Sequence, residues 1–337
     1  SALDFFLFVA FFPQLVAGPI ERASSLLPQM RSPRVFRSKR MLSGVDLVIW
    51  GFFKKLVIAD NCAWYVDQVF AAAGDPTVHG STLLVGAVLF AFQIYGDFSG
   101  YSDIAIGVAR LLGVDLMTNF RYPYFSRNIG EFWRRWHISL STWFRDYLYI
   151  PLGGSRGGSY RALRNILIVF VVSGLWHGAN KTFLAWGLYH GLLFIPLFLI
   201  GRNRADLDHL GDGPPSRVAM DIIRATVTFM LVCLGWVLFR AANLREAFSY
   251  FQGLTSHYGI TYDLLPRTLE GMNHPTLTTM ASLVLVMLAL EWANRRTSEP
   301  LSIKLPFGAH RLIKAGVLML IVFYGEFGAT EFIYFQF

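Results

Sequence analysis

The sequence predicts an all-α protein that crosses a membrane several times, and three observations lead to this prediction. The 337 residues are 54% hydrophobic and only 15% charged, with a mean hydropathy of +0.44, which is unsuited to a soluble domain of this size. Aromatic residues make up 16% of the chain, as expected where protein, lipid headgroups and hydrocarbon meet. Six apolar runs without a charged residue are separated by charged loops.

These runs are the expected membrane helices. Crossing a hydrocarbon core of roughly 30 Å takes about 20 helical residues, and only the run 182–200 approaches that length. The other runs are shorter, so we expect tilted, broken or partly immersed helices at 81–96, 165–176, 225–239, 275–290 and 315–325. Segment 97–115 is polar and contains several glycines, and we expect a re-entrant element there.

The charges of the loops predict an orientation. Residues 31–40 carry five basic side chains, and residues 121–164 carry eight against two acidic ones, so both belong on the cytoplasmic side. Loops 60–80 and 258–276 are mainly acidic and belong on the opposite side. The net charge of +8 therefore indicates contact with anionic membrane lipid, and no nucleic acid partner is expected.

One membrane domain over residues 1–337 is the simplest organisation. The chain has no internal repeat, and the most linker-like segment, 202–217, is expected to be a surface loop. Cys62 and Cys233 are the only cysteines, so neither a disulfide framework nor a cysteine-based metal site is encoded. The sequence also lacks the serine elbow of hydrolases, the His-Glu-x-x-His motif and a carboxylate cluster at metal spacing, so no metal is expected.

His137 is the first candidate for chemistry. The stretch 131–150 predicts one helix at the cytoplasmic membrane surface, with Arg134 and Arg135 turned away from an inward-facing aromatic stripe. That stripe consists of residues at helical spacings, namely Trp133, Trp136, His137, Leu140, Trp143, Phe144 and Tyr147. The alternative is an anchoring helix whose histidine only bonds a backbone carbonyl.

His177 is the stronger candidate. It follows twelve apolar positions from Asn165 to Trp176, which advance about 18 Å at 1.5 Å per residue and leave His177 at membrane depth. Ionisable groups at that depth are candidates for function. Ser173 lies one helical turn back, and Gly174 and Gly178 leave space for a ligand or a backbone. A neutral imidazole there can take a proton from a hydroxyl that attacks a thioester. The alternative is a histidine that joins two helices.

Three further features are weaker. His190 lies in the middle of the run 182–200, where packing is the simpler explanation. The segment 92–107 contains Asp97, Tyr101 and Asp103 directly after an apolar run. Its two carboxylates are expected to orient a histidine, to pair with an arginine or, as we prefer, to stabilise a broken helix. The glycine-rich stretch 151–159 contains Arg156 and offers backbone amides to a phosphate, but a flexible loop explains it equally well.

Together these motifs resemble the membrane-bound O-acyltransferase (MBOAT) family, in particular its bacterial alginate O-acetyltransferase branch. The resemblance covers nearly the whole chain. It rests on FFPQLVAGPIER at 11–22, GFFKKLVIADN at 51–61, QIYGDFSGYSDIAIG at 93–107, NFRYPYFSRNIGEFWRRWHISLSTWFRDYLYIPLGG at 119–154, SGLWHGAN at 173–180 and the closing FIYFQF.

The resemblance implies a ring of tilted and broken helices around a central funnel, in a bacterial inner membrane. Its pattern makes His177 the catalytic base and His137 a second, upstream histidine. Acetyl-CoA is the expected acyl donor, with no bound cofactor, and periplasmic partner proteins finish the acetylation of an exopolysaccharide. Members have further helices before the segment that opens here, so we expect this chain to lack N-terminal helices of the full-length protein.

The remaining candidates for substrate binding come from the segments that contain the two histidines, from segment 92–107 and from the glycine-rich stretch 151–159. A cluster of arginines, to which Arg127 also belongs, is expected to attract the phosphates of the donor, although lipid headgroups explain it too. The full candidate set is Ser173, Trp176, Asn180, Arg134, Arg135, Arg156, Asp97 and Tyr101. Two alternatives stay open: an acyltransferase with another cargo, such as D-alanine, a lipid or a peptide, and a polysaccharide channel or exporter without chemistry.

Overall fold

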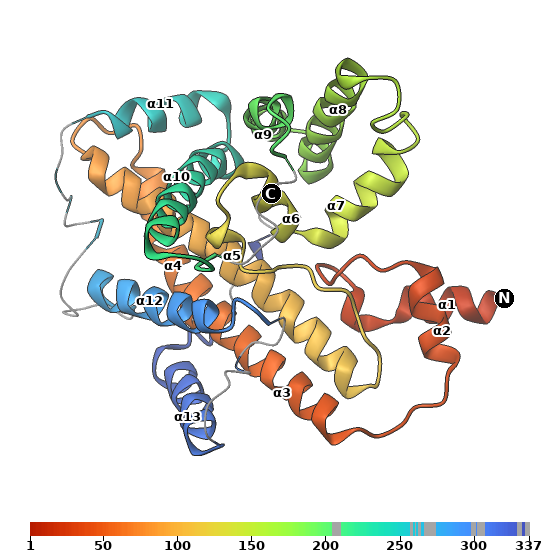
Figure 1. Cartoon of the computed structure of the whole chain (residues 1–337). Helices are drawn as coiled ribbons and strands as arrows, with labels where there is room; N and C mark the ends of the chain where they lie inside the picture. The colour runs from red at the N-terminus through yellow and green to blue at the C-terminus, as the bar shows by residue number, and fades with distance from the viewer. Residues whose placement is uncertain are drawn as a thin grey trace.

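The computed structural model describes residues 1–203, 210–256, 259, 261, 264–265, 274–297, 301, 307–328 and 332–333. Every regular element within these ranges is helical (Figure 1). The α-helices are α1 (Ala2–Ala10), α2 (Ala23–Arg31), α3 (Ser38–Phe52), α4 (Asp60–Ala71), α5 (Gly80–Leu111), α6 (Ile129–Arg135), α7 (Ile138–Phe144), α8 (Ser159–His177), α9 (Lys181–Leu199), α10 (Pro215–Arg240), α11 (Leu244–Leu254), α12 (Leu277–Ala293) and α13 (Phe307–Tyr324). The shorter elements are 3₁₀ turns at Phe12–Gln14 and Pro123–Phe125 and π-helical turns at Phe53–Ala59 and Arg145–Tyr149.

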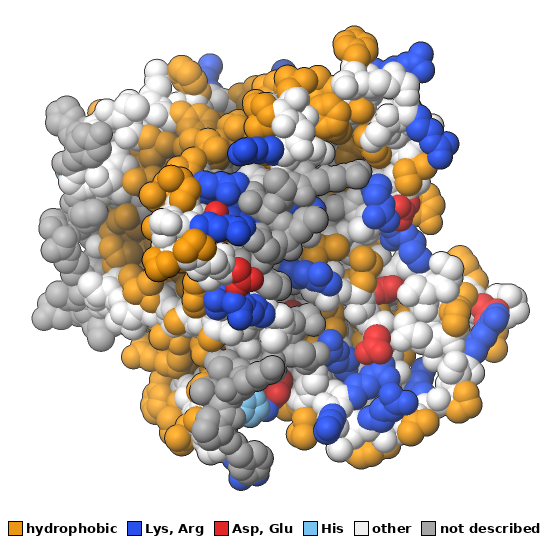
Figure 2. Space-filling view, viewed as in Figure 1, with side chains coloured by type: hydrophobic (Ala, Val, Ile, Leu, Met, Phe, Trp, Pro, Cys, Tyr) orange, Lys and Arg blue, Asp and Glu red, His pale blue; other side chains and the backbone are white. Residues whose placement is uncertain are grey.

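Each of the six apolar runs lies within a helix except for at most two residues at one end, which confirms an all-α membrane fold. Within the described residues, α5, α9 and α10 are long and apolar enough to cross a membrane, and α12 is a shorter apolar helix. Helix α8 contains the run 165–176, and α13 contains the run 315–325 up to Tyr324. Hydrophobic side chains cover much of the visible surface, as expected for a surface in contact with lipid (Figure 2). The loop 258–276, with Asp263, Arg267 and Glu270, lies largely outside the described residues.

Several helices begin where a side chain caps the free backbone amides of the first turn. Asn128 accepts from Glu131 N at 2.8 Å to begin α6, and Asn180 accepts from Thr182 N at 3.2 Å to begin α9. Asn243 and Thr276 do the same for α11 and α12. These caps fix where α6 and α9 start, and both helices contribute to the candidate site.

Helix α5 runs through the middle of the molecule, with α3 packed along it (Figure 1). Glycines bring the two backbones into contact: a Cβ at Gly51 or Gly100 would collide with the carbonyl oxygen of the other, and Gly44 and Gly107 form a second such pair. Small residues allow this approach between membrane helices. The expectation of a re-entrant element at 97–115 was wrong, because α5 continues without a break to Leu111.

Buried ion pairs explain why α5 stays helical through its polar half. The Lys55 ammonium lies 2.7 Å from a carboxylate oxygen of both Asp97 and Asp60, and Lys54 lies 2.7 Å from Asp103. Both lysines belong to the π-helical turn Phe53–Ala59. Since this turn presents two cations to α5, the two carboxylates on α5 are neutralised without the helix breaking.

The prediction of one continuous helix over 131–150 was also wrong. Helix α6 ends at Arg135, His137 has a left-handed backbone with φ of 43°, and α7 begins at Ile138. Two backbone hydrogen bonds to the preceding loop hold this break open, from Arg121 N to Arg135 O at 3.0 Å and from Ile138 N to Asn119 O at 2.9 Å. The pairing between distant segments therefore overrides the helical pattern of the side chains.

Helices α8 and α9 form a hairpin whose backbones touch at two glycines. A Cβ on Gly174 would collide with the Phe183 carbonyl, and one on Gly187 would collide with the Phe170 carbonyl. The space beside Gly174 is thus filled by a neighbouring backbone, one of the two uses predicted for it. This contact places the end of α8, and with it His177, against α9.

Substituting valine for Gly174 should push α8 and α9 apart. We expect a loss of about 1–3 kcal/mol, the usual cost of overpacking, seen as a lower melting temperature in detergent. Gly316→Val is the matched control, because a Cβ at Gly316 on α13 meets no atom within 4 Å. Equal melting temperatures for the two variants would contradict the close contact.

Candidate active site

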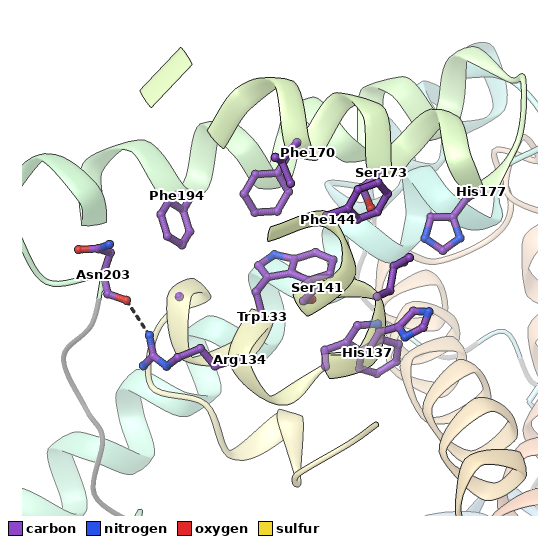
Figure 3. A pocket seen from close by; sticks show the side chains of 14 residues that line it. Trp133, Arg134, His137, Ser141, Phe144, Phe170, Ser173, His177, Phe194 and Asn203 are labelled. Carbon is purple, nitrogen blue, oxygen red and sulfur yellow. Dashed lines mark hydrogen bonds between the residues drawn. The ribbon is translucent and has the colours of Figure 1, made fainter. Parts of the chain in front are cut away.

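His137 and His177 line one cavity of about 300 Å³, although forty positions separate them in the sequence (Figure 3). This volume is at the lower end for small-molecule sites. The walls come from α6, α7, α8 and α9 and are mainly aromatic. The lining residues are Gly130, Trp133, Arg134, Trp136, His137, Leu140, Ser141, Phe144, Val169, Phe170, Ser173, His177, Phe194 and Asn203.

The cavity has different chemistry at its two ends. The side chain of Arg134 lies at one end, where its Nη1 donates to the Asn203 carbonyl at 2.6 Å. The two imidazoles lie at the other end, with the rings of Trp133 and Phe170 in between (Figure 3). A slender molecule with an anionic head therefore fits the cavity with its far end at the histidines.

Asn119 determines the orientation of His137. The buried amide oxygen Oδ1 of Asn119 lies 3.0 Å from His137 Nδ1 and accepts from Ser139 N at 3.3 Å and from Ser139 Oγ at 2.9 Å. The amide nitrogen donates to Ser102 Oγ at 3.1 Å. Because a backbone N–H can only donate, the atom facing Ser139 and His137 is the oxygen of the amide.

This bond assigns the proton of the His137 ring. Since Asn119 Oδ1 can only accept, Nδ1 of His137 carries a hydrogen, and Nε2 keeps its lone pair in the neutral ring. Burial lowers the pKa of His137 well below its ordinary value, and the nearby His177 acts in the same direction. His137 is therefore neutral near pH 7, with Nε2 able to accept a proton. The sequence did not single out Asn119, since nothing local links it to a histidine eighteen positions away.

His177 is the last residue of α8 and lies among aromatic rings. Its ring centroid is 4.9 Å from that of Trp176, 5.2 Å from Trp186 and 5.1 Å from Phe239. Trp176 also lies 6.2 Å from the His137 ring, so it contacts both histidines from outside the cavity lining. This apolar enclosure suits a neutral imidazole at this end of the cavity.

The structure brings some of the other predicted residues to this cavity. Ser173 and Arg134 line it with the two histidines, and Trp176 packs on both imidazoles. Asn180 lies just beyond, where its side chain caps α9 and donates to the Ala242 carbonyl at 2.8 Å.

The remaining predicted residues lie away from the cavity. Arg135 pairs with Glu131 at 2.6 Å, and Arg156 is exposed in the glycine-rich loop. Asp97 pairs with Lys55 and accepts from Ile333 N at 2.6 Å, while Tyr101 donates to the Leu15 carbonyl at 2.9 Å. Their substrate-binding roles stay predictions, and their contacts here are with the protein itself.

His190 is fully buried and packs against tryptophans. Its ring centroid lies 5.1 Å from Trp133 and 5.2 Å from Trp186. Neither ring nitrogen has a hydrogen-bond partner among the described residues. The ring supports Trp133 from behind, and Trp133 in turn lines the cavity.

Comparisons with known proteins identify the family of the chain. The model of the membrane-bound O-acyltransferase family matches residues 1–240. The chain is 40% identical, over 92% of its length and 56% of the relative's, to the probable alginate O-acetylase AlgI of Pseudomonas aeruginosa. It is 38% identical to the peptidoglycan O-acetyltransferase of Helicobacter pylori, over 77% of this chain and 48% of that protein. It is 29% identical to the teichoic acid D-alanyltransferase of Bacillus subtilis, over 69% of this chain and 60% of that protein. The chain thus spans about half the length of the curated relatives it matches.

Proposed function

The chain belongs to the membrane-bound O-acyltransferase family, and from this we propose that it moves an acetyl group from cytoplasmic acetyl-CoA across a bacterial inner membrane. The acceptor is a hydroxyl used in O-acetylation of an exopolysaccharide such as alginate. The observation that carries the proposal is the single cavity that holds both histidines. The names of the relatives in Pseudomonas and Helicobacter support acetyl as the cargo.

His177 acts as the general base in this proposal. Its imidazole removes the proton from the acceptor hydroxyl while that oxygen attacks the thioester carbonyl carbon. The carbon–sulfur bond then breaks, and the imidazolium returns its proton to the departing thiolate. The products are an acetyl ester and a free thiol, so the proton and the electron pair are balanced. His137 either positions the donor or relays a proton through Nε2.

The donor enters at the Arg134 end of the cavity. The loop charges predict that this end faces the cytoplasm, because residues 121–164 carry the basic excess. Arg134 binds a phosphate of the donor, and the aromatic middle of the cavity surrounds the apolar part of the thioester arm. Periplasmic acetyltransferase proteins receive or complete the transfer on the other side.

A second cargo, D-alanine, follows from the similarity to the teichoic acid D-alanyltransferase. Protein purified from membranes and incubated with radiolabelled acetyl-CoA, with and without the periplasmic partner proteins, tests the choice. We expect label transfer from acetyl-CoA that requires His177. Transfer from a D-alanyl thioester but not from acetyl-CoA would show that the cargo is D-alanine. The absence of transfer from either donor would favour a channel.

Replacing Asn119 with alanine should lower the acetylation rate by about 10²-fold, the size of effect that a small misplacement of a reacting group produces. His137 would then lose the acceptor that fixes its proton on Nδ1. Asn119→Asp keeps an acceptor there and should restore most of the rate, with an altered pH profile. Initial rates and melting temperatures of both variants check this, and unchanged kinetics in Asn119→Ala would rule out the positioning role.

A further inference from the structure

An apolar crevice of about 380 Å³ opens between α10 and α12, and it shares no lining residue with the cavity of the histidines. Ile222, Thr226 and Phe229 of α10 form one wall, and Leu288 and Trp292 of α12 form the other. Helix α10 is long and apolar enough to cross a membrane, and α12 is a shorter apolar helix. A slot between two such helices is suited to a hydrocarbon chain.

Arg295 adds a cation to one end of this crevice. It lies in the turn that follows α12, where its backbone N donates to the carbonyl of Trp292, a lining residue, at 3.3 Å. Its guanidinium carbon lies 4.4 Å from the centroid of the Trp292 ring. Its Nε donates to the carbonyl of Leu210, another lining residue, at 2.7 Å, and its Nη1 donates to the Trp292 carbonyl at 2.9 Å.

These bonds orient Arg295 without neutralising it. Both acceptors are backbone carbonyls, and no carboxylate pairs with Arg295 among the residues that the structure describes. The half-buried guanidinium therefore keeps its full charge beside an apolar slot. Such an arrangement favours an anion that has an apolar tail attached.

The surroundings of Arg295 carry excess positive charge. The described stretches 210–224 and 292–297 contain four arginines and two aspartates, which gives a net charge of +2. Asp212 pairs with Arg296, and Asp221 is shared by Arg127 and Arg224. Basic side chains lie beside the hydrophobic surface around α10 and α12 (Figure 2). An anionic headgroup is therefore attracted to this end of the crevice.

We propose that this crevice is a binding site for an anionic glycerophospholipid of the surrounding membrane. An acyl chain lies between α10 and α12, and the lipid phosphate bonds to the guanidinium of Arg295. A neutral lipid contacts only the apolar crevice, and a soluble phosphate contacts only Arg295. An anionic lipid contacts both and should therefore bind most tightly. The site is independent of the acyl-transfer function.

Lipid titration of the detergent-purified protein, with bound lipid measured by native mass spectrometry, tests the charged end. We expect phosphatidylglycerol to bind more tightly than phosphatidylcholine with the same chains. Arg295→Ala should weaken phosphatidylglycerol binding about fivefold and abolish most of the preference. Arg161→Ala, which removes an exposed arginine at the start of α8, is the matched control and should leave binding unchanged.

A second pair of variants tests the apolar part. Thr226→Phe fills the crevice and should reduce lipid binding, whereas Val227→Phe places the same ring on the adjacent exposed face of α10 and should not. Equal binding of the two lipids, or unchanged binding in both Arg295→Ala and Thr226→Phe, would overturn the site. Competition by glycerol phosphate as effective as that by the lipid would assign the site to a soluble phosphate and overturn the lipid proposal.

Discussion

A His177→Ala protein should insert into the membrane normally and lose acetylation by about 10²- to 10⁴-fold, the usual contribution of a general base. The ring of His177 contacts aromatic side chains at one end of the cavity, and its removal leaves the walls from α6, α7 and α9 in place. The loss should therefore appear in the rate of the chemical step. The incorporation of radiolabelled acetyl groups, normalised to protein in the membrane fraction, measures it.

Two further variants separate chemistry from folding and from transport. His177→Gln keeps a polar side chain of similar length but cannot cycle a proton, so it should be nearly as inactive as His177→Ala, whereas a channel would tolerate it. His190→Phe changes the other imidazole of the same helix hairpin, which is buried, and should retain most activity, because His190 packs on aromatic rings. Wild-type acetylation by His177→Ala would remove His177 from the mechanism.

The sequence located the membrane helices well, for a physical reason. A backbone in hydrocarbon must satisfy its own hydrogen bonds, so an apolar run of sufficient length has few choices other than a helix. Each of the six runs lies in a helix except for at most two residues at one end, including the short ones at 165–176 and 315–325.

The errors arose where distant segments decide the local backbone. The break at His137 depends on hydrogen bonds to Asn119 and Arg121, and no pattern within 131–150 records them. The unbroken course of α5 depends on Lys54 and Lys55. These lysines lie more than forty positions upstream of the carboxylates that they neutralise, Asp103 and Asp97. The hydrophobic periodicity of a segment depends on that segment alone. It therefore does not reveal hydrogen-bond or ion-pair partners that the fold brings from elsewhere in the sequence.

The same separation in sequence hid the buried ion cluster around Arg127. Its side chain is fully buried, with Nε 3.1 Å from one oxygen of Glu131 and Nη2 3.2 Å from the other. Nη1 donates to Asp221 at 3.2 Å, and Asp221 belongs to α10. Arg127 thus connects the loop before α6 to the first turns of α10. The sequence assigned it to the phosphates of the donor, and its contacts here are with two carboxylates of the protein.

Replacing Arg127 with methionine should destabilise the protein by about 3 kcal/mol, the lower end of the range for a broken buried ion pair. Glu131 and Asp221 lose the buried cation between them and keep only the less buried Arg135 and Arg224 as partners. A large fall in melting temperature and in the amount of membrane-inserted protein should report this. Arg145→Met removes an exposed arginine whose partner is Asp146 and should cost at most about 1 kcal/mol.

The cause of the Arg127→Met defect can be separated from lost packing. If uncompensated charge is responsible, neutralising both acids in the triple variant Arg127→Met, Glu131→Gln, Asp221→Asn should recover much of the stability. If the triple variant melts no higher than Arg127→Met, the guanidinium acts through shape rather than charge. Because α6 also carries Trp133 and Arg134, the recovered protein should regain the cavity and with it acetylation. Stability recovered without activity would instead mean that the position of α6 depends on Arg127 itself.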